Sequence, residues 1–300
     1  MRSFIVILLL VVLDSSGQNI PFADGSEMEH NRIIKNKIKS ITTYTYNGDS
    51  ALTKGVKTMY KEYDKKGNPI KEDEFTIDGN LDMQTISVNN NGKMSDTSKQ
   101  YNMNGEVVYE SIGFFNMKGQ EIKDISYGKG HIKTINTYEF DKNGGVIRND
   151  MFDSNSNLIY YTIYKYDEKG RMILDSGITS DIDNGKRIYY LDRKYVHCYN
   201  ENKRFKVTKN YNGNNELSVI DTEKFDSNWN TTEYITYDAN DGSIRGKQIS
   251  EYSKDGKEVK FICDNAIIQS YYDNNGNIVE EIDYRSGIIE ERKKYYYEFY

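Results

Sequence analysis

The segment YDKKGNPI at residues 63–70 contains the pattern that decides the fold: an aromatic residue, a glycine four positions later, and an aliphatic residue three positions after the glycine. Seven segments share it, with the triads Tyr63/Gly67/Ile70, Tyr101/Gly105/Val108, Phe115/Gly119/Ile122, Phe140/Gly144/Ile147, Tyr166/Gly170/Ile173, Tyr252/Gly256/Val259 and Tyr272/Gly276/Val279. Recurrence of one short unit is the sequence signature of a repeat architecture. We therefore expect each of these glycines to mark the turn of one structural unit.

The residues around each glycine favour a β-hairpin. An Asp or Asn after the aromatic residue can accept hydrogen bonds from backbone amides two residues on, and glycine supplies the positive φ that closes the loop. Two loop lengths fit this pattern. A four-residue loop would place Tyr63 and Ile70 on the same face of the sheet, whereas a three-residue loop with a glycine bulge would send them to opposite faces.

The segments between the turns alternate as β-strands do. Tyr160 and Tyr164 fall on one side of an extended segment, and Tyr161 and Ile163 fall on the other. Because both sides carry aromatic residues, we expect a sheet that is partly covered on each face. The prediction is an all-β fold of tandem antiparallel β-hairpin repeats that form a long meandering, twisted or curled sheet.

Two terminal segments complete the secondary-structure prediction. A short helix is expected within residues 24–35, outside the repeats. The chain ends on KKYYYEFY, which predicts a closing edge strand. Its Lys293 and Lys294 are expected to discourage pairing with any further strand.

The N-terminus has the order of a secretory signal peptide. Met1 and Arg2 precede an apolar run at residues 4–13, and small residues follow it. The run is shorter than the roughly 20 residues that a membrane-spanning helix needs, so we expect cleavage after Gly17. The predicted segments are a signal peptide at 1–17, a lead-in at 18–40 and a β-hairpin repeat domain at 41–300. The protein would then be exported, and periplasmic, cell-surface or secreted.

Composition narrows the classes of function. The chain has 27 Tyr and 11 Phe among its 300 residues, and these aromatics suit a half-buried pleated surface despite a mean hydropathy of −0.80. The net charge of −6 is mildly acidic, and Lys and Arg are scattered along the sequence. A nucleic-acid-binding surface is therefore not expected. No segment after the signal peptide is apolar enough to span a membrane.

The tyrosine-aspartate-glycine turns resemble the YD repeats of Rhs-type and teneurin-type surface proteins, over most of residues 44–300. The resemblance implies tandem hairpins that spiral into a β-shell, which in known members encloses a C-terminal toxin or presents a surface for adhesion and glycan contact. This chain departs from them: its units are shorter, and no non-repetitive segment follows the last repeat, so no cargo toxin is expected. The short period also resembles MORN-variant repeat proteins, our second choice.

The sequence offers few residues for catalysis, metals or cofactors. Each of the three histidines, His30, His131 and His197, is interpreted as an ordinary strand or loop residue. Cys198 and Cys263 permit a disulfide in an exported chain, but two separate thiols are the simpler interpretation. Acidic turns at Asp153, Asp181 and Asp226 begin like calcium loops without completing the pattern. We expect no enzyme, cofactor or metal site.

The surplus of tyrosine is the remaining functional signal. Aromatic residues either form the core through cross-strand pairs or present a contact surface for a ligand. The candidate aromatic contact surface consists of Tyr160, Tyr161, Tyr189, Tyr190, Tyr195 and Tyr199. We expect a non-catalytic scaffold that binds a protein or a cell-envelope glycan. The alternatives are an accessory or neutralising partner of a secreted toxin, and a glycan-active enzyme.

Overall fold

The computed structural model describes residues 25–47, 55–88, 95–183 and 186–300, which form one helix and twenty strands. They are α1 (Gly25–Lys35), β1 (Ile38–Asn47), β2 (Val56–Tyr63), β3 (Pro69–Phe75), β4 (Leu81–Val88), β5 (Ser95–Asn102), β6 (Val107–Phe115), β7 (Glu121–Gly128), β8 (His131–Phe140), β9 (Val146–Asp153), β10 (Leu158–Tyr166), β11 (Met172–Asp183), β12 (Lys186–Asn200), β13 (Phe205–Tyr211), β14 (Leu217–Phe225), β15 (Thr231–Asp238), β16 (Ile244–Tyr252), β17 (Glu258–Cys263), β18 (Ala266–Tyr272), β19 (Ile278–Arg285) and β20 (Ile288–Phe299). The predicted helix is confirmed. No described helix is long and apolar enough to cross a bilayer.

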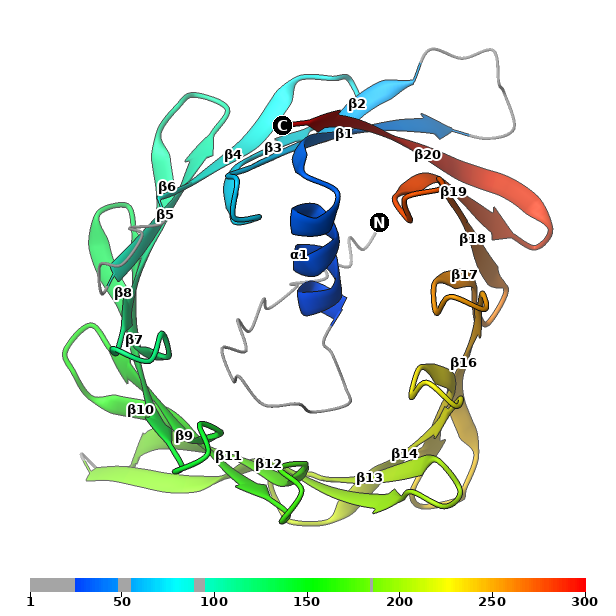
Figure 1. Cartoon of the computed structure of the whole chain (residues 1–300). Helices are drawn as coiled ribbons and strands as arrows, with labels where there is room; N and C mark the ends of the chain where they lie inside the picture. The colour runs from blue at the N-terminus through cyan, green and yellow to red at the C-terminus, as the bar shows by residue number, and fades with distance from the viewer. Residues whose placement is uncertain (1–24, 48–54, 89–94, 184–185) are drawn as a thin grey trace.

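The strands form one closed barrel. Each strand pairs antiparallel with the next, and β20 pairs both with β19 and with β1 (Figure 1). The predicted all-β array of antiparallel hairpins is confirmed. The sheet that we predicted as meandering, twisted or curled closes into a barrel, so the prediction that β20 is an edge strand is wrong. Lys293 and Lys294 do not block pairing, because they lie opposite Thr45 and Tyr44 in a backbone ladder that side-chain charge does not interrupt.

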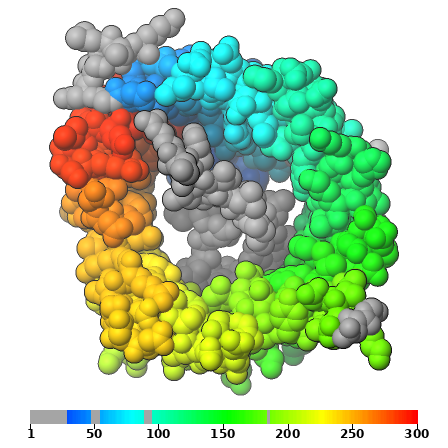
Figure 2. Space-filling model, turned by 180° about the vertical axis from the view of Figure 1, so that it is seen from behind, coloured from blue at the N-terminus to red at the C-terminus, as the bar shows by residue number. Residues whose placement is uncertain are grey.

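The barrel is too wide for side chains to fill. Barrels of about 8 strands have interiors that side chains occupy, and those of 16 to 18 strands leave an aqueous channel. Twenty strands enclose a lumen here, and Figure 2 shows the central opening. The molecule is therefore a single-layer wall with an inner and an outer face.

Hydrogen bonds of the first turn settle the loop length. The Asp64 amide donates to the Asn68 carbonyl at 2.9 Å and the Gly67 amide to the Asp64 carbonyl at 3.0 Å, which defines a three-residue loop with Gly67 at a φ of 80°. Tyr63 lies opposite Pro69, but Glu62 lies opposite Lys71, so Ile70 is an extra residue at a second bulge. This second bulge returns Ile70 to the face of Tyr63, a combination that neither sequence-based alternative included.

The turn aspartate fixes the loop. Asp64 Oδ1 accepts hydrogen bonds from the amides of Lys66 and Asn68 at 2.8 and 2.9 Å, and Asn68 Nδ2 donates to Asp64 Oδ2 at 2.9 Å. Burial of the carboxyl opposes ionisation, yet these hydrogen bonds outweigh it and lower the pKa of Asp64. Degenerate repeats keep this geometry without glycine, because Ser156 and Trp229 adopt φ values of 63° and 66° at the equivalent position.

Long charged side chains cover isoleucines on the outer face. Ile235 is only 8% exposed although no second layer packs on it. It lies opposite Lys247, and Glu233 binds both Lys247, at 3.0 Å, and Lys224. The aliphatic stems of these ion-paired residues shield the isoleucine from water. The outer face is therefore stabilised without the covering layer that the sequence suggested.

The most buried cluster lies where α1 meets the closing strands. Ile33 of α1 packs with Ile38, Ile41 and Tyr63. Asn277, at the turn between β18 and β19, is fully buried; its Oδ1 accepts a hydrogen bond from Asn36 Nδ2 at 2.8 Å. The helix is thus held at one end of the barrel, against the first and last repeats.

Candidate functional site

The position of α1 identifies the face of the wall that lines the lumen. The helix lies inside the outline of the ring in Figure 1, and its Arg32 Nη1 donates a hydrogen bond to the Tyr297 hydroxyl at 3.3 Å. Tyr297 therefore faces the lumen, as do Tyr295 and Lys293, which lie two and four residues before it on β20. Because cross-strand partners share a face, the lumen face can be followed around the whole ring.

A ladder of tyrosine hydroxyls joins neighbouring repeats along the α1 end of this face. The Tyr166 hydroxyl donates to the Val146 carbonyl at 2.8 Å, and Val146 is the residue opposite Phe140 at the preceding bulge. The same bond recurs from Tyr199 to Met172, Tyr252 to Thr231, Tyr272 to Glu258 and Tyr297 to Ile278, at 3.1, 3.1, 2.7 and 2.6 Å. Each hydroxyl supplies a donor at a place where a bulge interrupts the ladder. The sequence showed these tyrosines but not this role.

Polar pairs cover much of the lumen face beyond the tyrosine ladder. Asp124 accepts hydrogen bonds from Asn136 Nδ2 at 3.0 Å and from the Tyr138 hydroxyl at 2.8 Å. Across the ring, Asp221 accepts from Asn210 Nδ2 at 2.6 Å and from Thr236 Oγ1 at 2.7 Å. Polar networks of this kind suit a wall that faces water or a polar ligand rather than an apolar core.

A group of three carboxylates, one on β5 and two on β7, flanks the intervening strand β6. Asp96 and Asp124 both lie opposite Gly113, and a Cβ atom at Gly113 would be 2.5 Å from Glu121 Oε1. Glycine therefore makes room for the third carboxylate. Burial, followed by repulsion from Asp124 and Asp96, raises the pKa of Glu121 to about 7. Burial likewise raises the pKa of Asp175, which also lies on the lumen face.

The lumen face offers more acceptors than its own donors satisfy. Five buried amide and carboxylate oxygens receive no hydrogen bond from the described part of the chain: Oδ1 of Asn136, Asn149, Asp175, Asn210 and Asp283. All five lie on strand positions that face the lumen by the alternation followed above. A ligand rich in N–H donors or positive charge would complement such a wall.

A groove of about 430 Å³ lies on the lumen face at the seam where β1 meets β2 and β20. Thr43, Asn47 and Tyr295 line it together with the Glu291–Lys293 ion pair, whose charged atoms are 3.0 Å apart. The Tyr295 hydroxyl donates to Glu281 on β19. The groove therefore combines hydrogen-bonding groups with an aromatic ring, on the strands that close the barrel.

The glycines singled out from the sequence all lie in hairpin turns. They are Gly67, Gly105, Gly119, Gly144, Gly170, Gly256 and Gly276, and their φ values are positive, from 77° at Gly105 to 96° at Gly144. In each turn the glycine amide donates to the carbonyl three residues before it. In each turn, too, the amide of the residue after the aromatic donates across the loop, as it does from Asp141 to the Gly145 carbonyl at 2.8 Å.

The turn glycines do not gather into one site. Gly105 lies between β5 and β6, at the end of the barrel opposite α1, whereas the other six lie in turns at the α1 end. A Cβ atom at Gly119 or Gly256 would meet nothing within 4 Å, and at Gly276 its nearest neighbour would be the Lys257 side chain at 3.0 Å. These three glycines, with φ values of 79°, 82° and 84°, are therefore required for backbone conformation and not for contact with a ligand.

The six tyrosines of the candidate contact surface do not share one face. Tyr160, Tyr195 and Tyr199 face the lumen, and Tyr199 belongs to the tyrosine ladder. Tyr161 faces outward and its ring centroid lies 6.1 Å from that of Tyr189. Tyr189 and Tyr190 are about half exposed on β12. Strand alternation separates these residues, so the sequence-based surface is not one continuous patch.

Histidine, cysteine and acidic-turn residues are dispersed. His197 Nδ1 lies 2.9 Å from Thr208 Oγ1, and burial, with nearby Lys206, lowers its pKa to about 4. His30 lies on α1 and His131 begins β8. Cys198 and Cys263 are both free thiols on β12 and β17.

The acidic turns use their oxygens within the loop. Asp153 Oδ1 accepts bonds from the amides of Asn155 and Asn157, and Asp226 does the same in its turn. Asp181 lies on β11, where its Oδ1 accepts from the Ile182 amide at 2.7 Å. The described residues contain no group of three or more His, Cys, Asp or Glu that could hold a metal ion.

Comparisons with known proteins leave the family open. No protein-family model matches the chain, and no curated protein matches its sequence. A porin-like protein from Bacteroides uniformis is 12% identical, with 88% of this chain and 97% of that chain covered and a TM-score of 0.37. A protein of unknown function from Bacteroides fragilis is 12% identical over 39% of this chain and 92% of that chain, with a TM-score of 0.32.

A third solved structure is the Tc holotoxin pore of Photorhabdus luminescens. It is 10% identical over 80% of this chain but only 15% of that chain, with a TM-score of 0.33. At such low identities and TM-scores, none of these similarities supports an argument about function.

Proposed function

We propose that the protein is an exported, non-catalytic scaffold of the YD-like repeat type, and that its lumen face binds a basic segment of another protein. The observation that carries the proposal is the excess of unsatisfied acceptors and of carboxylates with raised pKa on that face, including Glu121 and Asp175. The pKa of Glu121 is raised by burial and then by repulsion from Asp124 and Asp96, and a cationic ligand would relieve that repulsion. Lysine and arginine side chains supply both the charge and the donors.

The protein's own helix illustrates this kind of binding. Arg32 of α1 donates to the Tyr297 hydroxyl and to Asn277 Oδ1, both at 3.3 Å, and its guanidinium carbon lies 5.7 Å from the centre of the Tyr297 ring. Tyrosine rings and amide oxygens of the wall thus hold a basic residue of a polypeptide segment. A neutralising or accessory partner of a secreted toxin would be one protein that binds such a segment.

The second candidate ligand is a cell-envelope glycan. The observation that favours it is the outward-facing pair of Tyr161 and the half-exposed Tyr189, since exposed tyrosine rings can stack on sugars. A glycan-active enzyme would instead need a carboxyl group near neutral pKa, and Glu121 is the group to test for that activity.

Fluorescence anisotropy tests the proposal, with the chain lacking residues 1–17 and three labelled probes: nona-arginine, a Gly-Ser peptide of equal length, and a soluble peptidoglycan fragment. We expect nona-arginine to bind most tightly and the lumen variant Asp175→Asn/Asp283→Asn, which neutralises two carboxylates with unsatisfied oxygens, to bind it at least fivefold more weakly. The matched control Glu251→Gln removes a carboxylate of the outer face, where it pairs with Lys260, and should leave binding unchanged.

Equal binding by the lumen variant and the control would contradict a site in the lumen. Tighter binding of the peptidoglycan fragment than of nona-arginine would support a glycan as the ligand instead of a basic protein segment. Release of reducing sugar from the glycan by the wild-type chain, but not by Glu121→Gln, would overturn the non-catalytic assignment.

A further inference from the structure

The turns at the two ends of the barrel differ in charge. At the α1 end, the described turns lie at residues 64–68, 116–120, 141–145, 167–171, 201–204, 226–230, 253–257 and 273–277. Their exposed basic residues are Lys65, Lys66, Lys118, Lys142, Lys169, Lys203, Arg204 and Lys254, and their exposed acidic residues are Glu168, Glu201 and Asp255. The same turns also hold half-buried charged residues, namely Arg171, Lys257, Asp64, Asp141, Asp167, Asp226 and Asp273. With ten basic and eight acidic residues in all, these turns are net positive and define what we call the basic end.

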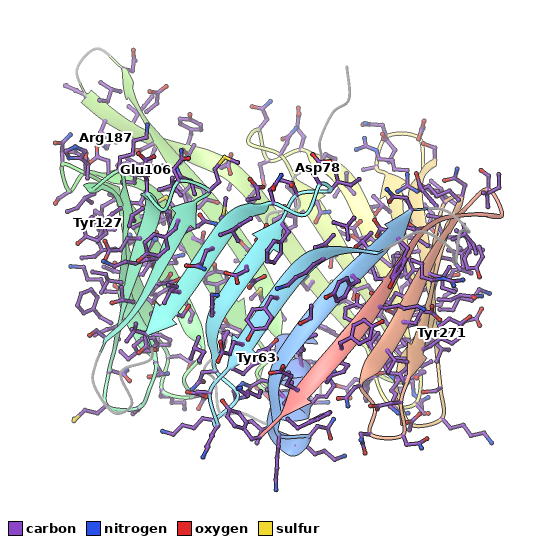
Figure 3. The ribbon with its side chains drawn as sticks, turned by 90° about the horizontal axis from the view of Figure 1, so that it is seen from above. Tyr63, Asp78, Glu106, Tyr127, Arg187 and Tyr271 are labelled. Atoms are coloured by element: carbon purple, nitrogen blue, oxygen red, sulfur yellow. The ribbon has the colours of Figure 1, made fainter. Side chains whose placement is uncertain are left out.

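The opposite end has the reverse balance. Its described turns lie at residues 76–80, 103–106, 129–130, 154–157, 212–216, 239–243, 264–265 and 286–287. Their exposed acidic residues are Asp78, Glu106, Glu216, Asp241 and Asp264, and their exposed basic residue is Lys129. Figure 3 shows Asp78 and Glu106 at this end, away from Tyr63 and α1. We call it the acidic end.

The acidic end also exposes large apolar side chains. Ile77, Met103, Ile244 and Ile288 are 66%, 62%, 58% and 72% exposed, and each lies in or directly beside a turn of this end. Exposed apolar groups that recur around a rim and are set among charges mark an interaction surface. The basic end offers a smaller apolar set that includes Met117 and Tyr300, 92% and 47% exposed.

The chemistry of the acidic end restricts its occupant. Carboxylates around an apolar rim are repelled by anionic lipid headgroups, and two acidic ends facing each other would place like charges together. The wall is closed into a ring, so an unpaired strand edge is confined to projecting segments such as Lys186–Arg193 of β12, which pairs with β11 but not with β13. The complementary surface present on this molecule is the basic end of another copy.

We propose that two copies of this chain associate head to tail, with the acidic end of one against the basic end of the next. The contact is heterologous, so a pair keeps one free acidic end and one free basic end, and further copies can add to form a stack. The β11–β12 hairpin, which carries Arg187 and extends past the other turns in Figure 3, lies alongside the neighbouring barrel in such a stack. The lumens of successive copies are then continuous.

Sedimentation velocity of the chain lacking residues 1–17 tests this inference. We expect concentration-dependent growth beyond the mass of one chain, and association at least tenfold weaker at 1 M than at 0.1 M salt, because screening shortens the reach of the end charges from about 10 Å to about 3 Å. A single species of one chain at every concentration, or association that strengthens with salt, would overturn the proposal.

Two end variants distinguish head-to-tail from head-to-head contact. Variant A, Lys118→Glu/Lys142→Glu, alters only the basic end; variant B, Ile77→Asp/Ile288→Asp, alters only the acidic end. Each variant alone should sediment as one chain. In an equimolar mixture, the intact acidic end of variant A should bind the intact basic end of variant B. These pairs should grow no further, because both of their outer ends carry substitutions. The matched control Lys165→Glu/Lys209→Glu changes exposed lysines of the wall and should associate like the wild type. Pairing by variant A alone would show a head-to-head contact and would overturn the proposal.

Discussion

Replacing Glu121 by Gln should remove a specific part of the pH dependence of stability. The pKa of Glu121 is raised from 4.5 to about 7 by burial and by Asp124 and Asp96, so the folded chain holds this proton more strongly than the unfolded chain does. Between these two values the folded state binds more protons, and stability therefore falls as pH rises through this window. A pKa difference of this size between the folded and unfolded chains corresponds to roughly 3.4 kcal/mol of folding stability, at about 1.36 kcal/mol per pKa unit. Because the carboxyl is partly exposed to solvent, which screens its charge, we reduce the expected contribution to about 1.5 kcal/mol.

Urea denaturation at pH 5 and pH 8 measures the effect. At pH 5 the wild-type carboxyl is mostly protonated and resembles an amide, so the two proteins should have similar stability. The free energy of unfolding of Glu121→Gln relative to the wild type should therefore be about 1.5 kcal/mol larger at pH 8 than at pH 5. The control Glu110→Gln removes a carboxylate that pairs with Lys99 at 3.1 Å on the outer face, and should shift stability equally at both values. Identical pH profiles for the wild type and Glu121→Gln would refute the carboxylate cluster.

Three further predictions test the repeat and the helix. Tyr252→Phe should cost about 1 kcal/mol in urea denaturation, because the Thr231 carbonyl loses its donor at 3.1 Å, whereas Tyr127→Phe on the outer face should stay within about 0.5 kcal/mol. Ser156→Gly should stabilise by about 1 kcal/mol and Gly170→Ala should destabilise by about 1–2 kcal/mol, since both positions have positive φ; equal effects in thermal melts would contradict the turn geometry. Asn277→Ala should speed amide hydrogen exchange of residues 25–36, because Arg32 and Asn36 lose their acceptor; unchanged exchange would mean that the helix is held otherwise.

The local structure could be predicted from the sequence because it depends on residues close together in the chain. The aspartate after Tyr63 and the glycine at 67 specify a hairpin through bonds within five residues. Alternation along the strands follows from the same local rule. The second bulge at Ile70 could not be predicted, because it depends on how Glu62 and Lys71 pair across the strands and not on the turn itself.

Closure and the lumen face depend on contacts between distant residues. Thr43 of β1 lies opposite Tyr295 of β20, and the local sequence of neither segment specifies this pairing. The carboxylate group of Asp96, Glu121 and Asp124 forms only when three strands are in register, with Gly113 between them. The tyrosine hydroxyl ladder also needs neighbouring repeats in place, so the sequence indicated an excess of tyrosine without its role.

A disulfide across the seam tests closure of the barrel most directly. Thr42 and Tyr296 are opposite each other on the outer face of β1 and β20, so the pair Thr42→Cys/Tyr296→Cys, in a chain with Cys198→Ser and Cys263→Ser, should form a disulfide under mild oxidation. The cross-linked chain should migrate faster on a non-reducing denaturing gel, while the control Thr42→Cys/Tyr127→Cys should not change. If the Thr42→Cys/Tyr296→Cys chain kept both thiols free under the same oxidation, the result would contradict the closed barrel.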